Sequence, residues 1–347
     1  MQTIAILKTP GYTRVSFADS DKLITNELKL QKLSQIVENI KHENICGVTY
    51  VLFDVNKNIN ENDIILLSRL SFTYAIFELI EKKLLKPLLL NPEYFINPEL
   101  SGILKYSGKT NELFTRLMLN LAILHLKNAP TTPLNILDPL AGKGTTLFEA
   151  LMQGHHAYGV EIEPSPPQES VTYLKKYLET ARYKHSTHTE KVSGTSPHGK
   201  FTSTRYQLEI TKDKEGQKDP KHFEIIQGDT RNISHFYKKN QFSIIIADLP
   251  YGVHHGSKAG NKQLKKPQGG ITRNALGLIK EAMPEWVRSL KPGGVMVLAW
   301  NLFLISREEV EELLYSHGLK VPENASTLNF SHRVDQAIDR DIIICIK

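Results

Sequence analysis

Two short segments of the chain carry the residue types best suited to chemistry. They are the segments 138–146, DPLAGKGTT, and 248–252, DLPYG. The first combines two glycines with small neighbours, as in turns that let a nucleoside ligand reach the backbone. The second combines a carboxylate with a rigid, aromatic-tipped turn that can hold a planar amine. Together the two segments predict methyl transfer to a nucleobase.

The glycine turn separates an apolar run, which ends at Asp138, from a segment with a helical pattern. At Ala141, Gly142 and Gly144 a larger side chain would keep a ligand away from the backbone, and the amides of the following helix face that ligand. The alternative for this turn taken alone is a tight structural connection. The turn departs from the Gly-x-Gly-x-x-Gly dinucleotide pattern, which disfavours NAD.

Two acids that follow later predicted strands support a nucleoside site. Glu161 lies about twenty residues beyond the turn, where a carboxylate can accept hydrogen bonds from both ribose hydroxyls. Asp229 follows the third predicted strand and can accept a hydrogen bond from an adenine amino group. We therefore expect the cofactor to contact Asp138, Pro139, Ala141, Gly142, Gly144, Thr145, Glu161, Ile162, Asp229, Thr230 and Asp248.

The expected catalytic residues are Asp248, Leu249, Pro250 and Tyr251. They follow an apolar, β-branched run that predicts a buried strand, so their oxygens lie at the carboxyl edge of the sheet. Such oxygens can accept hydrogen bonds from an exocyclic NH2, orient its lone pair and stabilise the positive charge that grows on nitrogen. The Tyr251 ring offers a stacking surface for a base flipped out of any duplex. The alternative is a structural Asp-x-Pro turn.

Two other features carry less weight. Residues 107–110, SGKT, are similar to the end of a nucleotide-triphosphate loop, but that pattern requires glycine where Ile103 stands. An ATPase is therefore disfavoured. Glu149 is expected to be a surface or capping charge rather than a catalytic acid.

Composition indicates an ordinary globular protein. The 347 residues, 40% hydrophobic and 23% charged, suffice for one large domain and one smaller domain. The two cysteines are far apart in sequence, which favours a reducing cytoplasm and no disulfide or cysteine zinc site. No signal peptide or membrane span is expected. We expect no metal site, because four histidines lack companion ligands: His185, His188, His254 and His255.

The net charge of +6 and the pI near 9.0 favour a polyanionic partner. Two basic insertions, near 164–222 and 253–279, are the expected contacts with RNA. The second insertion has no acidic residue between Val253 and Ile279 and carries Lys258, Lys262, Lys265, Lys266 and Arg273. The alternative for each insertion is a solvated loop without a ligand.

Apolar patterns divide the chain into two parts. Residues 1–97 are expected to form a small α/β domain with helices over 26–40 and 61–83. Three X-Pro steps between residues 86 and 100 predict a linker, with a domain boundary near residue 98.

Residues 98–347 are expected to form the second domain, in which strands alternate with helices in a parallel, doubly wound sheet. The segment 292–294, Pro-Gly-Gly, is expected to be a turn, and the insertion between 163 and 223 to carry its own hairpin with a strand at 203–211. The expected strands are 134–137, 156–160, 223–226, 242–247, 295–300 and 342–346, and the expected helices are 110–126, 145–153, 279–290 and 307–317.

The chain resembles the class I S-adenosylmethionine-dependent methyltransferases, and most of all the tRNA guanine-N2 methyltransferase group with the RNA methylase domain. Three segments over residues 100–347 carry the resemblance: 106–122, which includes YSGKT and LMLNLA, then 138–150 and 248–252. Leu249 replaces a proline that is frequent in the family. The N-terminal part is similar to the family's RNA-binding region only over 64–80, and no complete THUMP domain can be traced.

The resemblance implies a Rossmann-like, seven-stranded sheet with an antiparallel last strand, S-adenosylmethionine as methyl donor and tRNA as substrate. It also adds Thr110 to the expected cofactor contacts. Our leading hypothesis is therefore transfer of a methyl group to N2 of a guanosine in tRNA. Two alternatives stay open: a DNA amino-methyltransferase acting on adenine N6 or cytosine N4, and a non-catalytic RNA-binding protein that retains the cofactor fold.

Overall fold

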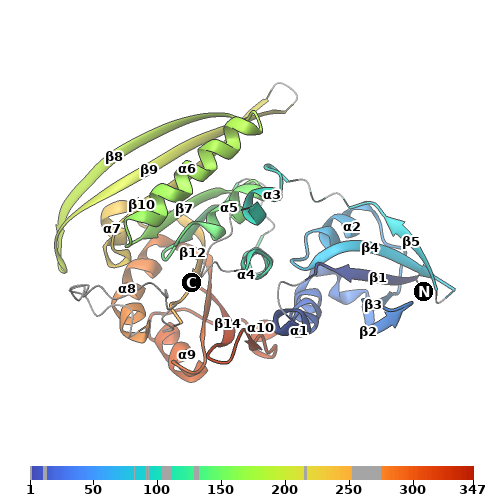
Figure 1. Ribbon diagram of the computed structural model, residues 1–347. Coiled ribbons are helices and arrows are strands. Elements are labelled where there is room, and N and C mark those ends of the chain that lie inside the picture. Colours follow the sequence, from blue (N-terminus) through green and yellow to red (C-terminus); the bar gives the residue numbers. More distant parts are fainter. Residues whose placement is uncertain are drawn as a thin grey trace, which may run out of the picture.

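The protein contains two β-sheets, a five-stranded sheet near the N-terminus and a nine-stranded sheet formed by the rest of the chain (Figure 1). The computed structural model describes residues 2–10, 14–81, 83–90, 92, 94–103, 111–128, 133–214, 217–251 and 275–347. The smaller sheet lies to one side of the larger one, and the helices α1 and α4 lie between them.

The first sheet has the β-α-β-β-α-β order of ferredoxin-like folds, followed by one added strand. Its strands are antiparallel and stand in the order β2-β3-β1-β4-β5. Its elements are β1 (Gln2–Lys8), α1 (Arg14–Leu30), the 3-10 turn η1 (Lys32–Gln35), β2 (Val37–Ile45), β3 (Val48–Val55), α2 (Glu61–Ser68), β4 (Thr73–Ile80) and β5 (Leu84–Leu88).

Two helices expected here end earlier than predicted. The segment 61–83 begins as a helix, capped by Asn60 in a capping box with Asp63, but α2 ends at Ser68. The residues that follow, TYAIFELI, are rich in β-branched and aromatic side chains and form β4 beside β1. Likewise α1 ends at Leu30, and residues 37–40 belong to β2. Tertiary pairing with β1 and β3 decides both outcomes.

The second sheet has the order β13-β14-β12-β11-β6-β7-β10-β9-β8. Strands β12, β11, β6, β7 and β10 are parallel, whereas β14 is antiparallel to β12. This confirms a Rossmann-like sheet with an antiparallel last strand. The bounds are β6 (Asn135–Asp138), β7 (His156–Glu161), β8 (Lys184–Ser196), β9 (Gly199–Lys214), β10 (Gln217–Gln227), β11 (Phe242–Asp248), β12 (Leu290–Asn301), β13 (His332–Arg333) and β14 (Asp339–Ile346).

Helices cover both faces of the second sheet. Alternate residues of β11 divide between two cores: Ile244 and Ile246 pack with α4 and α5, and Ile245 and Ala247 pack with α8 and α9. The helices are α3 (Glu99–Ile103), α4 (Glu112–Leu124), α5 (Thr145–Met152), α6 (Ser165–Thr180), α7 (Ile233–Phe236), α8 (Ala275–Ser289), α9 (Arg307–Ser316) and α10 (Glu323–Ser326), with the 3-10 turn η2 (Thr230–Asn232).

The sheet is larger than the seven strands expected, because the insertion after β7 adds two. It contains α6 and then the long β8–β9 hairpin, which pairs along β10 and forms the arch at the upper left of Figure 1. The strand expected at 203–211 is confirmed within β9, and β10 begins at Gln217 rather than Phe223. The segment 292–294 lies within the bounds of β12, but it interrupts the pairing with β11 and Gly293 has a φ angle of +72°, so the expected turn is present as a bulge.

The linker expected between 86 and 100 is also narrower than predicted. Pro87 lies in β5 and pairs with Phe77 of β4. A proline is tolerated there because β5 is the edge strand of its sheet and needs no donor on its outer side. Helix α3 begins at Glu99.

A buried acid connects the two sheets' helices. Glu27 of α1 accepts hydrogen bonds from the backbone and hydroxyl of Ser71 and from the side-chain amide of Asn120 on α4, at 2.7 Å. Asn120 also donates to the Arg69 carbonyl at 2.7 Å. Burial raises the pKa of Glu27 to about 7. This junction fixes α1 and the end of α2 against the larger sheet.

Candidate functional site

The predicted chemistry-bearing residues come together at one edge of the larger sheet. Asp138, Glu161, Asp229 and Asp248 end or follow β6, β7, β10 and β11, which are neighbouring parallel strands in the order β11-β6-β7-β10. The carboxyl ends of parallel strands meet at the same edge, where ligands of open α/β sheets bind. We refer to this row of acids as the carboxyl edge.

The glycine turn adopts the backbone geometry that glycine favours. Gly142 and Gly144 have φ angles of +51° and +85°, and no described atom lies within 4 Å of a Cβ built on Gly142. The turn is closed by hydrogen bonds from Ala141 to the Val160 carbonyl and from Gly144 to the Ala141 carbonyl, at 2.9 and 2.7 Å. The turn thus leaves open space in front of its backbone before α5 begins.

The Glu161 carboxylate is tied to the turn. One oxygen accepts from the Gly142 amide and the other from the Glu163 amide, both at 2.8 Å. Burial raises its pKa. Ile162 beside it is an apolar side chain that is 45% exposed. The Glu161 carboxylate is thus held by two backbone amides and lies next to the exposed apolar side chain of Ile162. This arrangement suits a ribose that carries a planar base.

Asp138 lies below the turn and is 5% exposed. It accepts hydrogen bonds from Leu140, at 2.9 Å, and from Thr146. Burial raises its pKa to about 7, and the nearby Asp248 and Glu161 act in the same direction. Pro139 and Thr145 are buried beside it. Asp138 therefore holds the turn together and adds to the acidic character of the edge.

Asp229 and Thr230 are both engaged within the protein. The Asp229 carboxylate caps η2 and accepts from Arg231 through Nε and Nη2, at 3.0 and 2.6 Å. Burial alone would raise the pKa of Asp229, but the hydrogen bonds from Arg231 hold it below its usual value. The Thr230 hydroxyl accepts from Trp286 Nε1 at 2.8 Å. An adenine amine at this position would share the Asp229 carboxylate with Arg231.

The second turn lies beside Asp138 at the end of β11. The Leu249 side chain is 1% exposed and packs in the core, and its amide donates to the Ala299 carbonyl at 2.8 Å, so only its carbonyl can face a ligand. The Tyr251 hydroxyl donates a hydrogen bond to the Asp248 carboxylate. Burial, the first cause, raises the pKa of Tyr251 well above its usual value. Tyr251 therefore stays protonated as a donor to Asp248.

Sequence reasoning missed the support behind this turn, which comes from β14 and α4. Arg340 Nη1 donates to the Tyr251 hydroxyl at 3.1 Å, and its guanidinium carbon lies 3.4 Å from the centre of the Phe114 ring. Arg340 Nε donates to His332 Nε2 at 3.0 Å. Burial and then Arg340 lower the pKa of His332 to about 3, so that its ring is neutral and accepts. Arg340 is far from the turn in sequence, and no local pattern indicates the contact.

The expectation that Glu149 is a surface or capping charge is wrong. Glu149 is fully buried, with 0% exposure, and forms an ion pair with Arg116 Nε at 3.0 Å. It also accepts from Ser101 at 2.7 Å. The buried pair joins α3, α4 and α5 behind the glycine turn, which gives Glu149 a structural role.

Several expected site residues lie outside the described part of the chain. They are Thr110 and Gly252, the histidines His254 and His255, and the basic residues Lys258, Lys262, Lys265, Lys266 and Arg273. Among the described residues there is no group of three or more His, Cys, Asp or Glu side chains that could hold a metal ion. No helix in the described ranges is long and apolar enough to cross a membrane.

Comparisons with known proteins agree with this geometry. Residues 116–276 match the UPF0020 family model, described as an RMKL-like methyltransferase domain. The match includes the glycine turn, Glu161, Asp229 and the second turn. No curated protein sequence matches the chain significantly.

The comparison with solved structures gives matches at low sequence identity. A candidate RNA methyltransferase from Pyrococcus horikoshii is 14% identical and aligns over 71% of this chain and 92% of its own, with a TM-score of 0.41. Magnesium protoporphyrin IX methyltransferase from Synechocystis, with bound S-adenosylmethionine, is 9% identical over 70% and 86%, with a TM-score of 0.39. A didemethyltoxoflavin N1-methyltransferase from Burkholderia thailandensis is 12% identical over 68% and 79%, also with a TM-score of 0.39.

The fold assignment rests on the strand order of the sheet and the family match rather than on these alignments. The larger sheet has a Rossmann-like strand order, and the segment that carries its glycine turn and carboxyl edge is similar to a methyltransferase domain.

Proposed function

We propose that this chain is a cytoplasmic enzyme that methylates an exocyclic amine of a nucleobase in RNA, namely N2 of a guanosine in tRNA. The observation that carries the proposal is the turn after β11. There Asp248 is held by the Tyr251 hydroxyl directly beside Asp138 and the glycine turn. This arrangement supports an amine acceptor next to a nucleoside cofactor.

The residues of the carboxyl edge fit S-adenosylmethionine. The open space in front of Gly142 leaves room for a ligand against the backbone, and Glu161 retains lone pairs for two ribose hydroxyls. Ile162 offers an apolar surface for the adenine ring, and Asp229 an acceptor for its amine. When bound, the cofactor supplies an electrophilic methyl group on a positively charged sulfur.

The chain's own residues would position the amine that receives this methyl. Asp248 and the Leu249 carbonyl accept hydrogen bonds from the two amine hydrogens, which directs the nitrogen lone pair away from them. Asp248 also stabilises the positive charge that develops on nitrogen and accepts its proton. Tyr251 and Arg340 hold the carboxylate in place, and no nucleophile from the protein is required.

The β8–β9 hairpin supports RNA as the substrate class. Gln227, the last residue of β10, stands level with Thr204 and Lys191, so residues 192–203 extend beyond the carboxyl edge. The Phe201 ring fixes this tip on α7 by an edge contact with Phe236 at 5.7 Å. The tip is thus a rigid extension of the sheet next to the cofactor residues.

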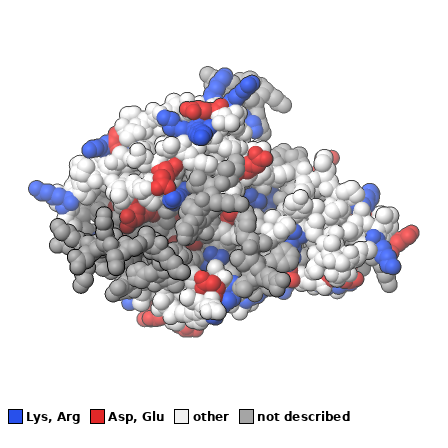
Figure 2. Space-filling view, in the orientation of Figure 1, with Lys and Arg blue, Asp and Glu red and all other residues white. Residues whose placement is uncertain are grey.

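The tip is also basic. Lys191 and Lys200 are exposed, and there is no Asp or Glu between Lys191 and Thr204. His198 at the turn is close enough to act on the pKa of Asp229, after the larger effects of burial and Arg231. Lys and Arg side chains also stand along the upper left margin of the molecule, where the hairpin lies (Figure 2). A phosphate backbone lying across this tip would bring a flipped base to Asp248.

Incubation of the protein with labelled S-adenosylmethionine and either bulk tRNA or duplex DNA tests the proposal. We expect label in tRNA, and mass spectrometry of its nucleosides should identify N2-methylguanosine. Label in DNA alone would favour the adenine N6 or cytosine N4 enzyme. Tight, salt-dependent RNA binding without label would favour the binding protein.

A further inference from the structure

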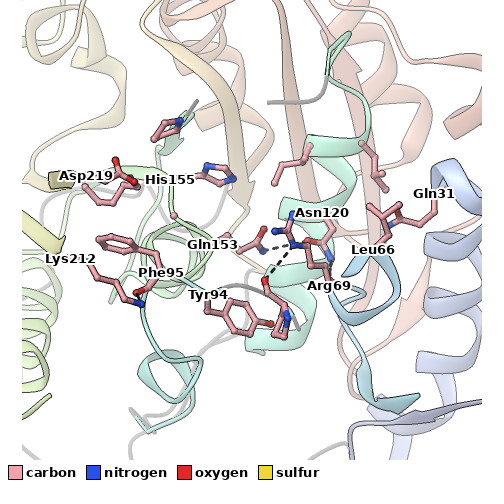
Figure 3. Close-up of a pocket in the computed structure, with 16 residues that line it drawn as sticks. Gln31, Leu66, Arg69, Tyr94, Phe95, Asn120, Gln153, His155, Lys212 and Asp219 are labelled. Carbon is pink, nitrogen blue, oxygen red and sulfur yellow. Dashed lines mark hydrogen bonds and ion pairs between the residues drawn. The ribbon is translucent and has the colours of Figure 1, made fainter. Parts of the chain in front are cut away.

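A cavity lies between the two sheets' helices, away from the carboxyl edge (Figure 3). Its volume is about 490 Å³, within the range of small-molecule sites. Gln153, Gly154 and His155 line it immediately before β7 begins, whereas Glu161 lies at the other end of this six-residue strand. At about 3.3 Å per residue, the two sites are roughly 17 Å apart along the strand.

The described charges of this cavity are mostly positive. Arg69, Lys212 and Lys221 line it together with a single carboxylate, Asp219. Lys221 is 2% exposed and forms an ion pair with Asp219, which is itself 62% exposed. Water screens the exposed Asp219 carboxylate. The positive charge of the buried Lys221 ammonium is therefore only partly balanced by this described counter-ion.

The titration of His155 reports the same positive environment. Burial, followed by the nearby charges of Arg69, His156 and Lys221, lowers the pKa of His155 to about 4. His155 is therefore neutral near pH 7 and adds no charge of its own. The positively charged Arg69, Lys212 and Lys221 and the neutral ring of His155 therefore line the same cavity.

Aromatic and apolar side chains form the rest of the wall. The ammonium groups of Lys221 and Lys212 lie 5.0 and 6.0 Å from the centre of the Phe95 ring, and Tyr94 lines the cavity next to it. Leu66 and Ile123 contribute apolar surface from α2 and α4. Figure 3 shows Lys212, Phe95 and Asp219 on one side and Gln31 and Leu66 on the opposite side.

The Gln31 side adds a polar requirement. Gln31 is 5% exposed, and its side-chain oxygen has no hydrogen-bond partner among the described residues. A buried acceptor without a donor destabilises the protein, so a ligand N–H at this point would be favoured. The cavity therefore suits a ligand with three parts. These are an anionic group at the lysine side, a hydrogen-bond donor at the glutamine side and a flat apolar part between them.

We propose that this cavity binds a nucleotide, with its phosphate at Lys221 and Lys212 and an N–H of its base at Gln31. The shared chemistry has two sources: a free nucleoside monophosphate, or the terminal nucleotide of an RNA chain. The site is separate from the carboxyl edge and does not depend on the function proposed there.

Isothermal titration calorimetry tests the proposal on the full chain saturated with S-adenosylhomocysteine. The probes are GMP, guanosine and inorganic phosphate. We expect one GMP per chain and at least tenfold weaker binding of each of the other two probes. Lys221→Met should weaken GMP binding at least tenfold, whereas Lys41→Met, the same change at a side chain that is 59% exposed on β2, should not alter it.

Two further variants keep the test decisive. Ile123→Trp fills the cavity and should abolish GMP binding, with folding checked by the thermal midpoint. Asp248→Ala should leave GMP binding unchanged, because it alters only the catalytic edge. RNA hexamers with a 5′-phosphate or a 5′-hydroxyl identify the source: competition by the phosphorylated hexamer alone supports an RNA end, and no competition by either supports a free nucleotide.

Three results would overturn the proposal: no GMP binding at millimolar concentration, equal binding by the wild type and Lys221→Met, or loss of binding in Asp248→Ala.

Discussion

The two ends of the larger sheet's parallel strands differ in charge and in how they are built. At the carboxyl edge, four acids each lie at the end of a parallel strand or within two residues of it, so the sheet alone places them together. The cavity near the amino ends of β7 and β10 is mostly basic, and it also needs side chains from α2 and the chain before α3. The topology of the larger sheet is thus enough to form the carboxyl edge, which suits a positively charged ligand with hydroxyl groups. The basic cavity, which suits an anion, forms only when the smaller sheet packs against the larger one.

The largest effect should come from Asp248→Asn, which retains shape but removes the negative charge at the amine. We expect kcat with tRNA to fall by about 10³-fold, because the charge acts mainly on the developing cation. S-adenosylhomocysteine affinity should change by less than about threefold. Single-turnover kinetics and calorimetry separate the two quantities. Unchanged turnover would remove Asp248 from the mechanism.

Glu161→Gln should affect the cofactor instead of the acceptor. Loss of two charge-assisted hydrogen bonds to ribose is expected to weaken S-adenosylhomocysteine binding by about 10- to 100-fold. GMP binding at the basic cavity should be retained, which makes it an internal control. If both ligands weaken together, the substitution has disturbed the sheet and the two ends are not independent.

The two ends should also respond to pH in opposite directions. The folded pKa of Asp138, about 7, is raised above the unfolded value of 3.8, so its contribution to stability increases as pH falls from 7 toward 4. The folded pKa of His155, about 4, lies below the unfolded value of 6.5, so its contribution is lost as pH falls from 6.5 toward 4.

Denaturant unfolding at several pH values, without cofactor, measures this difference against Asp138→Asn and His155→Asn. As pH falls from 6.5 to 5, the free energy of unfolding of the wild type should rise by on the order of 2 kcal/mol relative to that of Asp138→Asn. Relative to that of His155→Asn it should fall by a similar amount. Parallel curves for the wild type and either variant would show that the buried group does not titrate as described.

Sequence alone could place the four acids at one edge of the sheet because each of them stands next to a readable signal. Asp138 and Asp248 end apolar runs that could only be buried strands, and Glu161 lies at a fixed distance from the glycine turn. The parallel sheet followed from the alternation of strands and helices, and the antiparallel β14 from the resemblance. The parts that failed were decided by tertiary pairing: β4 formed from residues with an ambiguous apolar pattern, and β8–β9 extended the sheet beyond seven strands.

The supporting contacts were beyond sequence reasoning for a related reason. Glu149 looked like a surface charge on α5, and only the fold brings Arg116 to it. Lys221 sits in a polar stretch, QKDPKH, that has no periodic pattern, yet β10 buries it against Phe95. Residues whose role depends on partners far away in the sequence carry no local signal.

The smallest effect, and the sharpest test of the second turn, is expected from Tyr251→Phe. The substitution keeps the ring but removes the hydroxyl that joins Asp248 to Arg340. We expect kcat to fall about fivefold, roughly 1 kcal/mol, with KM for S-adenosylmethionine unchanged, because the carboxylate loses one fixing hydrogen bond but keeps its charge. Tyr315→Phe, at a side chain on α9 that is 53% exposed, is the matched control. A large rise in KM for tRNA with kcat intact would instead assign Tyr251 to stacking of the flipped base, since loss of the hydroxyl would then act through binding rather than through Asp248.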